Sequence, residues 1–186
     1  MGKGIDSTGV PSIEELKKTP GFPSEKRLME GPVAVIECVQ EIPCNVCEEV
    51  CPFGAIEVGE PIINLPKLDE EKCRGCGKCV ASCPGLAIFV VDYTFSQDEA
   101  LISLPYEFLP LPNVGSIVDA ADRYGRVVTK GRVVKVVDGK KFDHTAIVSI
   151  AIPKKYINEV RSIYITGKKF KQEGGKWRKR RGNQMM

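Results

Sequence analysis

The sequence has no long apolar run and nothing that resembles a secretory signal. None of its 186 residues lies in a stretch near the roughly 18–20 apolar residues that span a bilayer, so we expect no transmembrane helix. Residues 1–6 lack the apolar segment of a signal peptide. Asp6 also stands where a myristoylation site needs Ser or Thr. We therefore expect a cytoplasmic protein with no membrane partner.

Groups for organic catalysis are scarce as well. The only histidine is His144, beside a predicted strand, and the carboxylates of Asp119, Asp122 and Asp143 are not paired with a nucleophile. No G-x-G-x-x-G loop follows a predicted strand, and no flavin motif is visible. We therefore expect no catalytic residues, which would place any substrate oxidation on another subunit.

Cysteine is absent from most of the chain and concentrated in one window. Since cytosolic thiols are normally kept reduced, this concentration predicts a metal site rather than a disulfide framework. All eight cysteines fall within this window: Cys38, Cys44, Cys47, Cys51, Cys73, Cys76, Cys79 and Cys83.

The second half of this window has the spacing of a [4Fe–4S] site. Its cysteines are separated by two, two and three residues, and Pro84 follows the last of them. Bacterial ferredoxins use this run, in which the fourth cysteine ligates the other cluster. Gly75 and Gly77 permit the tight turns that bring the first three thiolates around one cube.

The first half of the window departs from that pattern. Glu41 stands where the first cysteine of the run is expected, and Cys38 lies three residues earlier. We predict that a lengthened loop at residues 39–43 still brings Cys38 to the first cluster. If Cys38 does not reach it, the first cluster becomes a three-iron species. The crosswise assignment gives cluster one Cys38, Cys44, Cys47 and Cys83, and cluster two Cys51, Cys73, Cys76 and Cys79.

Two four-cysteine zinc sites would also use eight thiolates, and this alternative stays open. Zinc modules usually present separated C-x-x-C pairs, however, whereas here a four-cysteine run ends in Cys-Pro. Residues 51–56 (CPFGAI) also repeat at residues 83–88 (CPGLAI). The repeat favours two [4Fe–4S] clusters.

Residues 33–93 resemble a two-cluster bacterial-type ferredoxin. This resemblance implies an α+β, pseudo-twofold βαββαβ domain. The segment GPVAVIECVQEIPCNVCEEVCPFGAI at residues 31–56, with CPGLAIFVVDY at residues 83–93, is similar to iron–sulfur subunits of flavin-dependent dehydrogenase complexes that oxidise proline or amino acids. That similarity implies a non-catalytic electron-transfer subunit in a hetero-oligomer with a flavoprotein. A free ferredoxin that serves several enzymes, or a zinc-bearing binding module, would be the alternatives.

The chain divides into four predicted parts. Within the second part, residues 55–58 and 61–64 are expected to pair as a hairpin. In the third, the predicted strands include residues 126–129 and 132–137 on either side of a turn at Gly131, and residues 154–163 could form a helix. The parts are an N-terminal arm with a short helix at residues 12–18 that begins with a capping box of Ser12 and Glu15 (1–32), the dicluster domain (33–93), a small β-rich, barrel-like docking domain (94–166) and a basic flexible tail (167–186).

Charge is distributed unevenly between the halves of the chain. Residues 1–93 carry 9 basic and 15 acidic residues, a balance of −6, whereas residues 94–186 carry 18 and 9, a balance of +9. Such bipolarity suits docking to a partner in one orientation. The tail includes Phe170 and Trp177 among basic residues, but it contains no nucleic-acid-binding module, so we expect no nucleic-acid partner.

Overall fold

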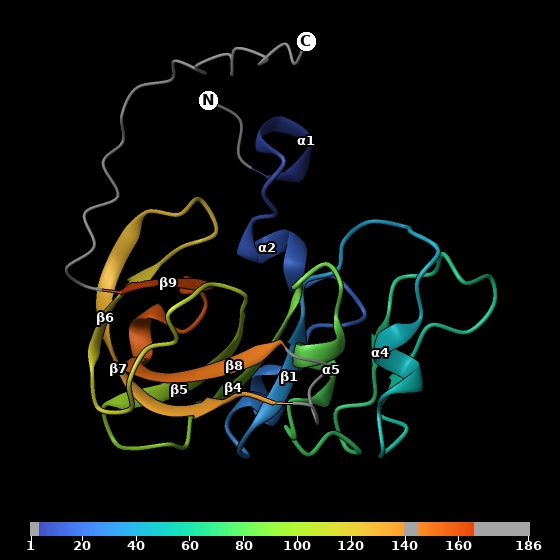
Figure 1. Ribbon diagram of the computed structural model, residues 1–186. Coiled ribbons are helices and arrows are strands. Elements are labelled where there is room, and N and C mark those ends of the chain that lie inside the picture. The colour runs from blue at the N-terminus through green and yellow to red at the C-terminus, as the bar shows by residue number, and fades with distance from the viewer. Residues whose placement is uncertain (1–3, 140–144, 166–186) are drawn as a thin grey trace, which may run out of the picture.

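A seven-stranded sheet is the main feature of the computed structural model, which describes residues 4–139 and 145–165. The sheet curls on one side of the molecule, and the cysteine-bearing segment lies beside it (Figure 1). Every neighbouring pair of strands is antiparallel. In order across the sheet, the strands are β1 (Val33–Ile36), β4 (Ile88–Asp92), β5 (Glu99–Tyr106), β8 (Ala146–Pro153), β7 (Val127–Val137), β6 (Ile117–Ala121) and β9 (Ser162–Ile165).

Residues 33–92 follow the β-α-β-β-α-β order that the resemblance implies. Strand β1 pairs with β4, and the short strands β2 and β3 pair with each other in a separate sheet. Each pair joins one strand from the first half of the repeat to one from the second. The inner elements are α4 (Val46–Glu49), β2 (Ile56–Glu57), β3 (Lys67–Leu68) and α5 (Lys78–Ser82).

The predicted hairpin between residues 55–58 and 61–64 is wrong. The partner of β2 is β3, and residues 61–64 form a turn, in which the backbone N–H of Asn64 donates to the Pro61 carbonyl at 2.9 Å. The Asn64 side chain also donates to the Val58 carbonyl at 3.1 Å. Pro61 has no N–H to give to a ladder, so the chain turns before it can pair.

Residues 94–165 extend the same sheet. Strand β5 pairs with β4 on one side and with β8 on the other, while β9 pairs with β6 at the far edge. Over the described residues no pairing joins β9 to β5 or β1, so the sheet is open and the predicted barrel-like closure is not confirmed. The boundary at residues 93 and 94 stays a prediction, although strands from both sides of it are hydrogen-bonded.

Two local predictions in this part are wrong for identifiable reasons. Gly131 does not interrupt the chain but lies within β7, where a Cβ would come within 2.9 Å of Ile150 Cδ1. The glycine allows β7 and β8 to pack closely rather than making a turn. Only Lys154–Tyr156 (η2) is helical in the expected helix, and it is a 3-10 turn. The β-branched residues after it form β9 on the sheet.

The N-terminal arm contains three short helices and lies against the cysteine-bearing part. The predicted capping box is confirmed, because Ser12 Oγ accepts from the Glu15 N–H and the Glu15 carboxylate accepts from the Ser12 N–H. The Gly21 carbonyl accepts from the Ile36 N–H at 3.1 Å, which fixes the arm to the end of β1. The helices are α1 (Ile5–Thr8), α2 (Ile13–Leu16) and α3 (Glu25–Leu28).

One apolar core runs through the sheet and beneath the cysteine-bearing helices. Val33 and Ile88 on the ferredoxin-like side and Ile102 and Ile150 on the other side are almost fully buried in a single cluster. Each such side chain contributes about 1.5–3 kcal/mol on burial. Among the described residues, no helix has the length and apolar character to cross a membrane.

Candidate metal centres

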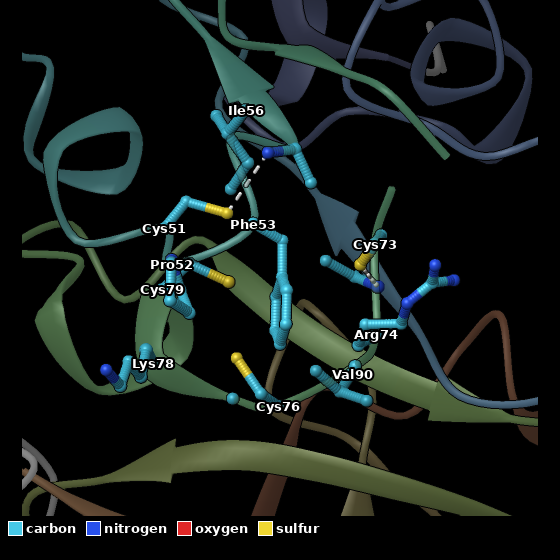
Figure 2. A pocket seen from close by; sticks show the side chains of 14 residues that line it. Cys51, Pro52, Phe53, Ile56, Cys73, Arg74, Cys76, Lys78, Cys79 and Val90 are labelled. Atoms are coloured by element: carbon cyan, nitrogen blue, oxygen red, sulfur yellow. Dashed lines mark hydrogen bonds between the residues drawn. The ribbon is translucent and has the colours of Figure 1, made fainter. Parts of the chain in front are cut away.

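Four cysteines from both runs line one hollow, which we name cavity two. The hollow measures about 330 Å³ and is open to solvent. Figure 2 shows the four sulfurs directed toward the same space, with the Phe53 ring beside them. Cys73 and Cys79 are buried, whereas Cys76 is exposed. The lining cysteines are Cys51 from the first run and Cys73, Cys76 and Cys79 from the second.

The other four cysteines line a second hollow of about 500 Å³, which we name cavity one. Cys47 is buried there, and the other three are half-buried. The lengthened loop brings Cys38 to this hollow, and the second run contributes its last cysteine. The lining cysteines are Cys38, Cys44, Cys47 and Cys83.

Two one-turn helices distribute the cysteines between the cavities. Helix α4 carries Cys47 for cavity one and is followed by Cys51 for cavity two, whereas α5 carries Cys79 for cavity two and ends at Cys83 for cavity one. The two helices pack against each other. Each ends where a Cys-Pro pair follows, since proline cannot continue the helix. The repeat thus produces a crosswise arrangement of thiols.

Backbone N–H groups point at three of the sulfurs. The Ala55 N–H donates to Cys51 Sγ at 3.2 Å, and the Ala87 N–H donates to Cys83 Sγ at 3.4 Å, at equivalent places in the repeat. The Ala34 N–H at the start of β1 donates to Cys73 Sγ at 3.4 Å. Hydrogen bonds to sulfur are one means by which proteins tune iron–sulfur centres.

The thiols need a positive partner to ionise together. Burial, together with the charges of Cys83 and Cys44, raises the pKa of the Cys47 thiol to about 11. Burial also holds the pKa of Cys79 well above its ordinary value, with added repulsion from the other cysteines of cavity two. Metal ligation requires thiolates. Four gathered thiolates therefore fit a site whose negative charge is balanced by bound metal.

The geometry differs from that of a single-ion site. Over residues 4–139 and 145–165, no three cysteine, histidine or carboxylate side chains are gathered so as to hold one metal ion. A tetrahedral zinc needs its four ligands within about 2.0–2.3 Å of one point. Here four cysteines line each of two hollows instead. The donor set fits two [4Fe–4S] clusters.

A buried ionic group beside cavity one was not predicted from the sequence. Glu37, immediately before Cys38, accepts hydrogen bonds from Arg123 and Arg161. Burial alone would raise the pKa of Glu37, but the hydrogen bonds and charges of the two arginines outweigh it and lower the pKa. No local sequence pattern could reveal this group, because Arg123 and Arg161 lie 86 and 124 residues after Glu37 in the sequence.

The remaining candidate acids do not gather into a catalytic arrangement. Asp119 pairs with Lys130, and Asp122 pairs with Arg126 at 3.1 Å. The first pair joins strands β6 and β7, and the second lies in the turn between them. Asp143, His144 and the basic tail lie outside the described residues.

Comparisons with known proteins agree with the donor set. Two family models, each described as a 4Fe-4S dicluster domain, match residues 37–88 and 65–136. The second match continues beyond Cys83 into strands that carry no cysteine. Since the chain has eight cysteines in all, the two overlapping matches correspond to two clusters.

Relatives match mainly the cysteine-bearing part. One subunit of the Na(+)-translocating ferredoxin:NAD(+) oxidoreductase complex of Acetobacterium woodii is 60% identical over 40 residues, 22% of this chain and 11% of the relative. One subunit of an ion-translocating oxidoreductase complex of Methanosarcina acetivorans is 53% identical over 47 residues, 25% of this chain and 17% of the relative. An uncharacterized ferredoxin of Methanocaldococcus jannaschii is 37% identical over 68 residues, 36% of this chain and 40% of the relative.

The chain thus spans well under half the length of each of these relatives. No solved structure matches it. The cysteine spacing, the two cavities and the family matches agree on the chemistry. The matched part of the chain, residues 37–136, is of the 4Fe-4S dicluster ferredoxin type, and the matches indicate two [4Fe–4S] clusters.

Proposed function

We propose that the protein is the electron-transfer subunit of a larger oxidoreductase, with its clusters ligated crosswise in cavities one and two. When bound, each [4Fe–4S] cluster supplies a site that takes up and releases one electron. The observation that carries the proposal is the gathering of four cysteines, drawn from both runs, around each hollow. The chain's own groups supply the thiolates and the N–H donors that hold the two sites.

Strand β1 connects the two sites directly. Its second residue, Ala34, donates to Cys73 of cavity two, and Cys38 of cavity one follows its end. Ala34 and Cys38 are four positions apart, so at about 3.3 Å per residue of extended chain the path along the backbone is at most roughly 13 Å. Because β1 is buried and paired with β4, this separation is fixed. The arrangement supports a short path for an electron between a donor and an acceptor.

A flavoprotein dehydrogenase subunit is the partner that we propose. The similarity to iron–sulfur subunits of amino-acid and proline dehydrogenases supports it, and relatives named as subunits of oxidoreductase complexes support a hetero-oligomer. The absence of a dinucleotide loop is consistent with electrons that arrive from another chain. Eight thiols suit a reducing compartment, and we place the protein in the cytoplasm.

Anaerobic purification of the native protein tests this function. Iron, flavin and co-eluting chains are counted in the fraction that contains the protein. We expect a flavoprotein to co-elute in a fixed ratio and its substrate to bleach the visible absorption of the clusters. A flavin-free monomer on gel filtration would instead support the alternative, a free ferredoxin that serves several enzymes.

The docking role proposed for residues 94–166 is tested without truncation. Deleting this part would remove the partner strand of β4, because β4 pairs with β5. Phe108 and Leu109 are 68% and 85% exposed on the loop after β5. Changing both to Ser is expected to abolish co-elution of the flavoprotein while iron content is retained. Unchanged co-elution would refute a docking role for this loop.

A further inference from the structure

An ionic group with little exposure to solvent lies beside cavity one. The Glu37 carboxylate accepts from Arg123 at 2.7 and 2.5 Å and from Arg161 Nε at 2.6 Å. The side chains of Glu37 and Arg161 are 7% and 4% exposed, and that of Arg123 is 14% exposed. Two guanidinium groups against one carboxylate leave a net charge of +1. Charges in such a place are screened far less than charges on the surface.

Short backbone links join this group to two sulfurs of cavity one. Cys38 follows Glu37 directly. The Glu37 N–H donates to the Ala87 carbonyl at 2.8 Å, and the Ala87 N–H donates in turn to Cys83 Sγ at 3.4 Å. Ala87 lines cavity one and also the surface hollow that Glu37, Arg123 and Arg161 border. The backbone at Glu37 and Ala87 therefore connects the positive group to residues that line cavity one.

Ion pairing with Glu37 does not by itself explain why Arg161 is buried. Arg123 already makes a two-point contact with this carboxylate. Arg161 Nη1 donates to the carbonyls of Ile157 and Val160, but its buried Nη2 has no hydrogen-bond partner among the described residues. The guanidinium carbon lies 5.0 Å from the centre of the Phe89 ring. An unpaired buried donor costs free energy, which points to a use for the charge.

We propose that the Glu37–Arg123–Arg161 group sets the reduction potential of the cluster in cavity one by holding net positive charge beside it. This inference rests on the proposed ligation of that cluster by Cys38, Cys44, Cys47 and Cys83. Reduction adds negative charge to the cavity, and a buried positive charge stabilises that state, which raises the potential.

No group of two arginines on one carboxylate lies beside cavity two among the described residues. Arg74 and Lys78 there are exposed, and Arg27, which donates to the Cys73 carbonyl at 2.9 Å, is half-buried, whereas Arg161 beside cavity one is buried. Exposed charges are largely screened by solvent and salt. The structure thus assigns the effect to one of the two clusters, so the two potentials respond differently to changes in this group.

Two substitutions by uncharged glutamine test the proposal, because they change the net charge of the group in opposite directions. Glu37→Gln leaves two arginines and raises the net charge to +2, whereas Arg123→Gln leaves it at zero. Both midpoint potentials are measured by anaerobic redox titration of the holoprotein, followed by electron paramagnetic resonance. We expect Glu37→Gln to raise one potential and Arg123→Gln to lower the same potential, while the other stays in place.

Controls separate this proposal from the ligation on which it rests. The wild-type protein must contain about eight irons per chain, and the signal lost in Cys44→Ala identifies cavity one; a lower iron count would refute the ligation itself. Arg132→Gln removes an exposed arginine paired with Glu99 and is expected to move neither potential.

The sign of the shifts decides between charge and structure. If the group only stabilises the contact between the two parts of the chain, both substitutions weaken this contact and shift the potential in the same direction. The proposal would be overturned if both substitutions shifted this reduction potential in the same direction, or if neither variant shifted it at full iron content.

Discussion

Cavities one and two come from the same repeat but are supported in different ways. Cavity two rests on packing: helix α5 lies against β5 and β8, and a Cβ on Gly77 would come within 3.2 Å of Ile147 Cδ1. Cavity one is bordered by the loop before Cys44, on which Ile42 is exposed. Residues 33–66 carry six glutamates and no lysine or arginine. Equivalent thiol sets thus lie in different surroundings: close packing at cavity two, and at cavity one an acidic segment in which Glu37 is paired with two arginines.

Removing one buried cysteine from each cavity is expected to have the largest effect. Cys47→Ala and Cys79→Ala change equivalent positions of the repeat, one in each cavity. Each variant is expected to lose about four of about eight irons, and the two variants lose different paramagnetic signals. Iron analysis with spectroscopy of the reduced protein checks this. Loss of the same signal in both variants would contradict the division of the cysteines between the cavities.

A change in packing is expected to affect cavity two alone. Gly75 has a φ of +60°, and a Cβ there would come within 2.7 Å of Pro32 Cβ and 2.8 Å of its carbonyl oxygen. Gly75→Ala therefore destabilises the fold by about 1–3 kcal/mol, and heating releases the cluster in cavity two first.

Gly54→Ala is the matched control for this variant, because Gly54 also has a positive φ, of +56°. A Cβ on Gly54 meets nothing within 4 Å. The melting temperature and the visible absorption of both proteins are measured under anaerobic conditions. Equal behaviour of the two variants would show that close packing does not support cavity two.

Acidification is expected to weaken the support of cavity one. Because the pKa of Glu37 is lowered below its ordinary value of 4.5, its ionised form stabilises the fold above that pH. This stabilisation is lost as the pH falls through the lowered value. The stability advantage of wild type over Glu37→Gln therefore shrinks on going from pH 7 to below pH 4.5. An advantage that is independent of pH would show that the Glu37 charge does not stabilise the fold.

The smallest expected effect lies away from both cavities. Ser103 and Ser149 share a hydrogen bond of 2.7 Å between β5 and β8, and Ser149 is buried. Ser149→Ala removes it and lowers the free energy of unfolding by about 1 kcal/mol. Both cluster signals are expected to persist, as measured by denaturation and spectroscopy. Loss of one signal would show that the sheet supports that cavity more directly than its contacts indicate.

Local patterns in the sequence predicted the parts of the site that are themselves local. The Cys-Pro repeat and the spacing of the second run predicted two iron–sulfur clusters, and the Ser12–Glu15 capping box was visible within four residues. The ligation of each cluster remains a prediction, although the structure gathers the same sets of cysteines around the cavities.

Features that depend on distant residues were not predicted. Gly131 was expected to form a turn because glycine often marks turns. Its contacts with Ile150 and Ile152 on the neighbouring strand arise only when β7 and β8 pair, so the sequence could not show them. The open edge at β9 and the group formed by Glu37, Arg123 and Arg161 likewise arise from tertiary contacts. Propensity and spacing carry no information about such contacts.

The crosswise sharing of cysteines is tested most directly at Cys83. Cys83 belongs to the second run in sequence but lines cavity one with Cys44. The reduced Cys83→Ala protein is compared by electron paramagnetic resonance with Cys44→Ala and Cys76→Ala. Our account predicts that Cys83→Ala loses the same signal as Cys44→Ala and keeps the signal that Cys76→Ala loses. Loss of the Cys76→Ala signal instead would show that each run encloses its own cluster and would contradict the account.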